Sequence, residues 1–182
     1  MTDDHQLMSM VQKGQVNMLA PLFEKYHVAL FNYFLRHGNS NAIAEDLVQE
    51  TFIKVLAYRS SYQGRGSFRG WLYGIARNTM ADQYRKSQNR HESHDTEHVE
   101  NMHGASLEGT LQDQQSDQLF HKALTTMNGE YRDLLILSRF QQLNYEEIAA
   151  MTACNLNTLK SRMRKAVGLL KDTYQQLLGE QS

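Results

Sequence analysis

A chain of 182 residues, 41% of them hydrophobic, is long enough to form one ordinary domain or two small ones with packed cores. A single proline and many strong helix formers favour an all-helical protein. One cysteine excludes an intramolecular disulfide framework, and no apolar run approaches the roughly 20 residues that span a bilayer. We therefore expect a cytoplasmic protein that does not insert into a membrane.

Charge is segregated along the chain, although the formal net charge is only −1. Residues 65–90 hold six Arg or Lys and one acid, and residues 91–118 hold seven acids with no Arg or Lys. Residues 154–171 hold five Arg or Lys and no acid. Two basic blocks on either side of an acidic stretch indicate two surfaces that bind polyanions.

Apolar residues at three- and four-residue spacings predict helices on both sides of an irregular stretch. In the first half they cover residues 5–13, a longer segment ending near Gly38, residues 41–58 and residues 68–86, with a glycine-bearing loop at residues 60–67. In the second half they cover residues 116–127, 131–140, 145–151 and 156–178.

Residues 89–115 lose this periodicity and are rich in His, Glu, Asp, Gln, Ser and Gly, which is typical of a flexible linker. The predicted fold is therefore all-α. Two small helical domains, residues 1–88 and 116–182, are joined by a flexible acidic linker at residues 89–115.

Residues 144–166, NYEEIAAMTACNLNTLKSRMRKA, have the pattern of a helix-turn-helix, whose second helix enters the major groove of DNA. Candidate residues facing outward near the start of that helix are Asn155, Asn157, Thr158, Lys160 and Ser161. Among these, Asn157, Thr158 and Lys160 suit base edges. Candidate phosphate contacts are Arg162, Arg164 and Lys165. The alternative is a solvated basic face on a plain helical hairpin.

This segment resembles region four of the extracytoplasmic-function (ECF) RNA polymerase sigma factors, which contacts the −35 promoter element in that family. Residues 42–62, AIAEDLVQETFIKVLAYRSSY, are similar to the polymerase-binding helix of region two. Residues 67–88, SFRGWLYGIARNTMADQYRKSQ, resemble its promoter-melting segment. The chain departs from the family at Ala153, where a glycine is frequent, and the turn also lacks the proline or glycine often found near Asn155 and Asn157.

Asp46, Gln49 and Glu50 share one helical face, because three- and four-residue spacings place side chains together. Such a polar, acidic patch suits a basic partner, which the resemblance identifies as core RNA polymerase, at the coiled coil of its largest subunit. Without the resemblance, a solvated outer face would be the preferred explanation of the pattern.

Aromatic rings and cations can hold bases that have left the duplex stack, at roughly 1–3 kcal/mol per stacked base. The resemblance assigns this role, at the melted −10 element, to the glycine-bearing loop and the segment that follows it. The candidates are Tyr62, Arg65, Arg69, Trp71, Arg77 and Asn78. Phe68 and Trp71 could equally be core residues, because their spacing with Leu72 and Ile75 is apolar.

The resemblance implies a non-enzymatic sigma factor that binds core RNA polymerase and promoter DNA, acts in a stress response and has an anti-sigma factor as partner. A helix-turn-helix regulator that works without polymerase is the alternative. A metal-dependent enzyme built on His91, His94, His98 and His103 is disfavoured, since the chain has no zincin helix and no phosphate-cradling glycine loop. We expect no cofactor and no metal, with these histidines belonging to a polar tether.

Overall fold

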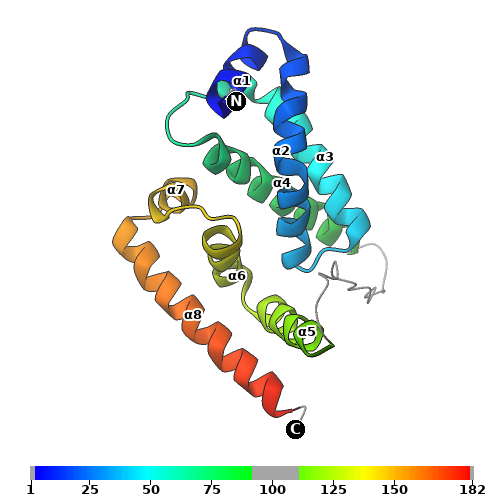
Figure 1. Cartoon of the computed structure of the whole chain (residues 1–182), viewed down its shortest axis with the longest axis vertical. Coiled ribbons are helices and arrows are strands. Elements are labelled where there is room, and N and C mark those ends of the chain that lie inside the picture. The colour runs from blue at the N-terminus through cyan, green and yellow to red at the C-terminus, as the bar shows by residue number, and fades with distance from the viewer. Residues whose placement is uncertain (1–2, 92–110, 181–182) are drawn as a thin grey trace. The chain divides into compact units, whose positions relative to one another are not determined.

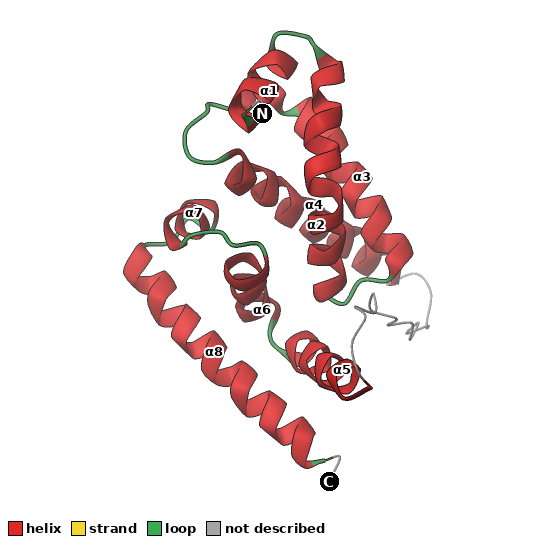
Figure 2. Ribbon diagram, in the orientation of Figure 1, coloured by secondary structure: helices red, strands yellow, loops and turns green. Residues whose placement is uncertain are grey.

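The computed structural model describes residues 3–91 and 111–180 of the chain. Within these ranges the chain forms helices and loops but no strand, so the all-α prediction is confirmed (Figure 1, Figure 2). The described residues divide into two compact units, one of residues 3–34 and 41–91 and the other of residues 35–40 and 111–180.

The first unit is built from four helices and two short 3-10 turns. The helices are α1 (Asp4–Gln12), α2 (Leu19–Arg36), α3 (Asn41–Ala57) and α4 (Phe68–His91), and the turns are Val16–Met18 and Arg59–Ser61. These bounds match the predicted helices closely, except that α4 runs five residues further than the predicted end at residue 86.

The second unit contains four α-helices and one π-helical segment. They are α5 (Leu111–Thr126), α6 (Gly129–Leu135), the π-helix Ile136–Phe140, α7 (Tyr145–Met151) and α8 (Leu156–Gly179). Helices α4 and α5 extend into the predicted linker, residues 89–115, from its two ends. The middle of that segment, with His94, His98 and His103, lies outside the described residues.

Aromatic side chains join the helices of the first unit. Phe23 of α2 meets Phe52 of α3 at a ring-centroid distance of 5.0 Å, and Tyr33 of α2 meets Tyr73 of α4 at 5.3 Å. Edge-to-face aromatic pairs of this kind add about 0.5–1.5 kcal/mol to the free energy of area burial. The core of this unit therefore depends on rings contributed by α2 as well as on the packing of α3 along α4.

Ile43 of α3 is apolar and yet 38% exposed, because it does not belong to the buried stripe of the helix. The buried stripe of α3 starts instead at Ala44 and continues through Leu47, Val48 and Val55. Ile43 lies one position away from this stripe, and a helix turns by 100° per residue, so its side chain points off the core.

The helix-turn-helix of the second unit has specific caps at both of its helices. Asn144 and Glu147 form a capping box at the start of α7, with both side chain to backbone hydrogen bonds at 2.8 Å. Asn155 caps α8 by accepting hydrogen bonds from the backbone N–H groups of Asn157 and Thr158, at 2.9 and 3.0 Å.

The turn between these helices contains an alanine in the left-handed region. Ala153 has a φ of 50°, a conformation that costs a residue with a Cβ atom roughly 1–2 kcal/mol. Glycine is therefore the residue that the backbone favours here, which gives a physical reason why glycine is frequent at this position in the family that the segment resembles.

We expect Ala153→Gly to raise the free energy of unfolding by about 0.5–1 kcal/mol, because the relief of strain exceeds the extra entropy of glycine in the unfolded chain. Urea unfolding followed by circular dichroism measures the change. Ala150→Gly, on the exposed face of α7, is the matched control and should lower stability by about 1 kcal/mol. A loss of stability at both positions would contradict the strain argument.

Candidate functional site

A loop with two glycines connects the Arg59–Ser61 turn to α4 (Figure 2). We call residues 62–67 the glycine loop. Gly64 and Gly66 have φ values of 66° and 75°, which a residue with a side chain adopts only with strain. Residues 63–66 are exposed, and the loop ends where the Ser67 hydroxyl accepts a hydrogen bond from the Gly70 N–H, at 3.0 Å. The loop therefore presents backbone and the side chain of Arg65 to solvent.

Tyr62, a predicted −10 contact, is the first residue of the glycine loop and is buried, with only 6% of its surface exposed. Its ring lies 5.0 Å from Trp71 and 5.9 Å from Phe68, centroid to centroid, and its hydroxyl is hydrogen-bonded to His5 Nδ1. Burial, together with the negative charges of Asp3 and Asp4, raises the pKa of Tyr62 to about 12. The ring therefore fixes the first residue of the loop against Phe68 and Trp71 of α4.

The other predicted −10 contacts differ in exposure. Arg65 and Asn78 are exposed, whereas Arg69, Trp71 and Arg77 are half-buried. Phe68 belongs to the core, with 1% exposure, while Trp71 keeps part of its indole accessible next to the loop. The structure therefore places Arg65 in the glycine loop, Trp71 against Tyr62 at the first residue of that loop, and Asn78 further along α4.

Asp46 and Gln49 are exposed on α3, and Glu50 is half-buried beside them. Ile53 lies one further turn along the same face and is 67% exposed, although it is a large apolar residue in mid-helix. The sequence interpretation missed Ile53. Its seven-residue spacing from Asp46 is the signal that could have found it. We call Asp46, Gln49, Glu50 and Ile53 the α3 face.

A set of ion pairs supports this face from α4. Lys54 Nζ lies 2.7 Å from an oxygen of Asp82 and 3.4 Å from one of Glu50, while Lys86 Nζ lies 3.9 Å from Glu50. The hydrogen bonds from Lys54 and Arg85 lower the pKa of Asp82. Burial opposes the charge of Lys54, but Asp82 and Glu50 together raise its pKa. The charge of Glu50 is therefore partly compensated, whereas Asp46 has a more open position.

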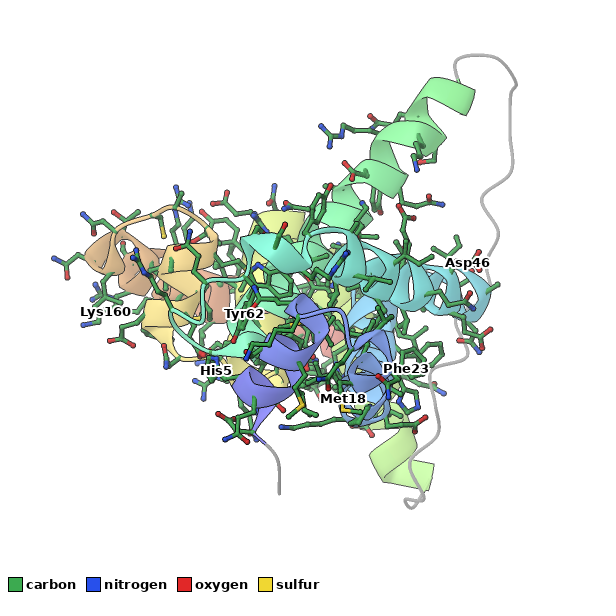
Figure 3. The ribbon with its side chains drawn as sticks, turned by 90° about the horizontal axis from the view of Figure 1, so that it is seen from above. His5, Met18, Phe23, Asp46, Tyr62 and Lys160 are labelled. Carbon is green, nitrogen blue, oxygen red and sulfur yellow. The ribbon has the colours of Figure 1, made fainter. Side chains whose placement is uncertain are left out.

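All eight residues predicted to contact the −35 element are exposed, at the start of α8 or just before it. Figure 3 shows Lys160 pointing outward from the ribbon. Three of the eight have structural contacts as well. Asn155 uses its side-chain oxygen as the cap of α8, Arg162 lies 2.8 Å from Glu130, and the ammonium of Lys165 lies 5.5 Å from the centre of the Tyr131 ring.

Ile148 of α7 and Leu159 and Met163 of α8 are buried and hold the two helices together. The opposite face of α8 carries no acidic side chain from Asn155 to Lys171. A positive helix face beside a buried apolar face is the arrangement that the DNA-binding helix of a helix-turn-helix requires.

Within residues 3–91 and 111–180, three or more potential metal ligands of the His, Cys, Asp or Glu type do not come together. In the same part of the chain, none of the helices is both long and apolar enough to cross a membrane. The fold and its surfaces thus define a helical DNA-binding protein with a second, acidic surface on a separate unit.

Two family comparisons match the two units separately. Sigma-70 region 2 matches residues 22–90, and Sigma-70 region 4 matches residues 117–170. The ECF RNA polymerase sigma factor EcfG of Rhodopseudomonas palustris is 33% identical over 129 residues, which cover 71% of this chain and 69% of EcfG. The RNA polymerase sigma factor YlaC of Bacillus subtilis is 29% identical over 153 residues, or 80% of this chain and 85% of YlaC.

Among solved structures, the sigma factor RpoE of Bartonella quintana, in complex with the anti-sigma factor NepR, is similar with a TM-score of 0.65 and 26% identity. The likeness covers 90% of this chain and 98% of that one. The chain belongs to the sigma-70 family as an ECF sigma factor, and it directs RNA polymerase to promoters. These matches do not favour the alternative of a regulator that works without polymerase.

Asp82→Asn should lower the free energy of unfolding at pH 7 by up to about 1 kcal/mol, because it removes the carboxylate that pairs with Lys54. Since the pKa of Asp82 is lowered in the folded state, its stabilising effect is present above the unfolded value of about 4 and is lost as the pH falls through the folded value.

Urea unfolding of the wild type and of Asp82→Asn, at pH 7 and at pH 3, measures the difference in the free energy of unfolding. Asp46→Asn, the same change on an exposed carboxylate of α3, is the control and should leave stability nearly unchanged. If the two variants lost the same stability at pH 7, the ion pairs between α3 and α4 would contribute nothing specific.

Proposed function

We propose that the two units divide promoter recognition between them. The α3 face binds core RNA polymerase, the glycine loop and the start of α4 receive unpaired bases of the −10 element, and the exposed face of α8 reads the −35 duplex. The observation that carries this proposal is the acid-free face of α8 on one unit, together with the exposed acidic and apolar α3 face on the other.

The α3 face has the composition of a protein-binding surface. Ile53 offers an exposed apolar side chain, and the polar groups of Asp46 and Gln49 precede it along the same face. Interfaces concentrate their binding free energy in such central apolar residues, while charged neighbours set the orientation and the choice of partner. A basic, partly apolar helical surface on polymerase fits this combination.

The protein acts without catalytic chemistry of its own, in the cytoplasm, where polymerase and promoter DNA are found. An anti-sigma factor is a further partner, and the NepR complex of the similar RpoE supports this assignment. Run-off transcription with core polymerase and promoter fragments tests the whole proposal, because product should form only when core enzyme and this chain are both present.

Ile53→Asp should weaken binding to core polymerase by about tenfold, since it places a charge at the apolar centre of the α3 face. Biolayer interferometry with immobilised core enzyme measures the affinity. Val28→Asp is the matched control, because Val28 is also a β-branched residue in mid-helix and is 56% exposed. Equal losses for the two variants, or none for Ile53→Asp, would remove the α3 face from the proposal.

On α8, Arg164→Ala should weaken holoenzyme binding to all promoters alike and reduce the slope of log affinity against log salt by about 0.9, as expected for one lost phosphate contact. Lys160→Ala should instead change the preference among −35 sequences, by about 1–3 kcal/mol per lost base contact. Fluorescence anisotropy with a panel of −35 variants at several salt concentrations separates the two effects. Identical uniform losses would show that the assigned roles are wrong.

A further inference from the structure

Helix α1 contacts the chain on both sides of the point where the glycine loop begins. The side-chain amide of Gln12 donates two hydrogen bonds, to the backbone carbonyl of Arg59 at 2.8 Å and to that of Tyr62 at 2.7 Å. Both N–H groups of one amide are thereby used. These two carbonyls belong to the first residue of the Arg59–Ser61 turn and to the residue just after it, so a single side chain holds the segment that leads into the loop.

A second contact from α1 reaches the same loop. The rings of His5 and Tyr62 are stacked with a centroid distance of 5.8 Å and an interplanar angle of 25°. The Tyr62 hydroxyl is also hydrogen-bonded to His5 Nδ1, and the two labelled side chains lie side by side in Figure 3. Gln12 and His5 thus act on the backbone and on the side chain of the same residue.

Helix α1 is itself fixed to the rest of the first unit. The Asp4 carboxylate accepts hydrogen bonds from Lys25 Nζ, at 2.6 and 2.8 Å, and from the Tyr26 hydroxyl, at 2.5 Å. Leu7, Met8 and Val11 are buried. Because α1 is held by the core, it can hold the loop in a fixed position relative to that core. Helix α1 lies before the matched Sigma-70 region 2, which begins at residue 22.

We propose that α1 is a positioning element for promoter opening, in which Gln12 and His5 hold the glycine loop in the conformation that accepts an unpaired −10 base. The inference rests on the proposed function of that loop. Two glycines make residues 63–66 flexible in the absence of support, and ordering a flexible loop at the moment of binding lowers affinity. Contacts made before the DNA arrives remove that cost and narrow the range of bases that fit.

The test uses Gln12→Glu, which keeps the size of the side chain but places carboxylate oxygens against the two carbonyls. Gln6→Glu is the matched control, because it makes the same charge change on an exposed position of the same helix. Gln12→Leu and Gln6→Leu form a second pair without added charge. Each variant is assembled into holoenzyme with core polymerase, and binding of a single-stranded −10 non-template oligonucleotide and its single-base variants is measured.

For Gln12→Glu we expect about tenfold weaker binding of the oligonucleotide and a smaller ratio between preferred and non-preferred bases. For Gln12→Leu we expect about threefold weaker binding with the same loss of selectivity. Both Gln6 variants should remain within twofold of the wild type, and the affinity of all four variants for core polymerase should be unchanged.

The outcomes separate this inference from the proposed function. If wild-type holoenzyme does not select among the single-stranded oligonucleotides, the assigned role of the glycine loop is wrong. If the wild type selects and the Gln12 variants behave like the Gln6 variants, the loop role stands and the role of α1 is overturned. A parallel loss of core affinity and strand binding at Gln12 would also overturn it, because α1 would then be a general structural support.

Discussion

The packing of Tyr62 against Phe68 and Trp71 sets the geometry of the first unit at the end that carries the glycine loop. A loop with two glycines has little conformational preference of its own, so its shape must come from groups outside it. The buried tyrosine ring supplies an apolar anchor, and the contacts from α1 supply polar ones. Without these contacts, the position of the loop relative to the start of α4 would no longer be fixed.

Electrostatic contacts are distributed unequally over the two surfaces. On α3, Glu50 is compensated by lysines from its own helix and from α4, which leaves Asp46 as the more open charge. On α8, Arg162 and Lys165 have partners on α6, so part of the basic block stabilises the second unit itself. A formal net charge of −1 is therefore the sum of one acidic and one basic surface. On each surface, neighbouring side chains compensate part of the charge.

Local patterns predicted the helices well, because period and capping are encoded within a few neighbouring residues. The two helices of the helix-turn-helix, expected at residues 145–151 and 156–178, agree with α7 and α8 to within one residue. The burial of Tyr62 and the role of Gln12 were not predictable in this way. Gln12 meets a carbonyl 50 residues later in the chain, and no local pattern specifies such a contact.

The cap at Asn155 constrains how this protein could acquire a new promoter preference during evolution. Its side chain lies at the start of α8, and its oxygen accepts hydrogen bonds from two of the free N–H groups in the first turn, those of Asn157 and Thr158. Replacing a cap of this type costs about 1 kcal/mol of stability. On the proposed reading of the −35 element, specificity can change more readily at Asn157, Thr158, Lys160 and Ser161, whose side chains do not cap the helix.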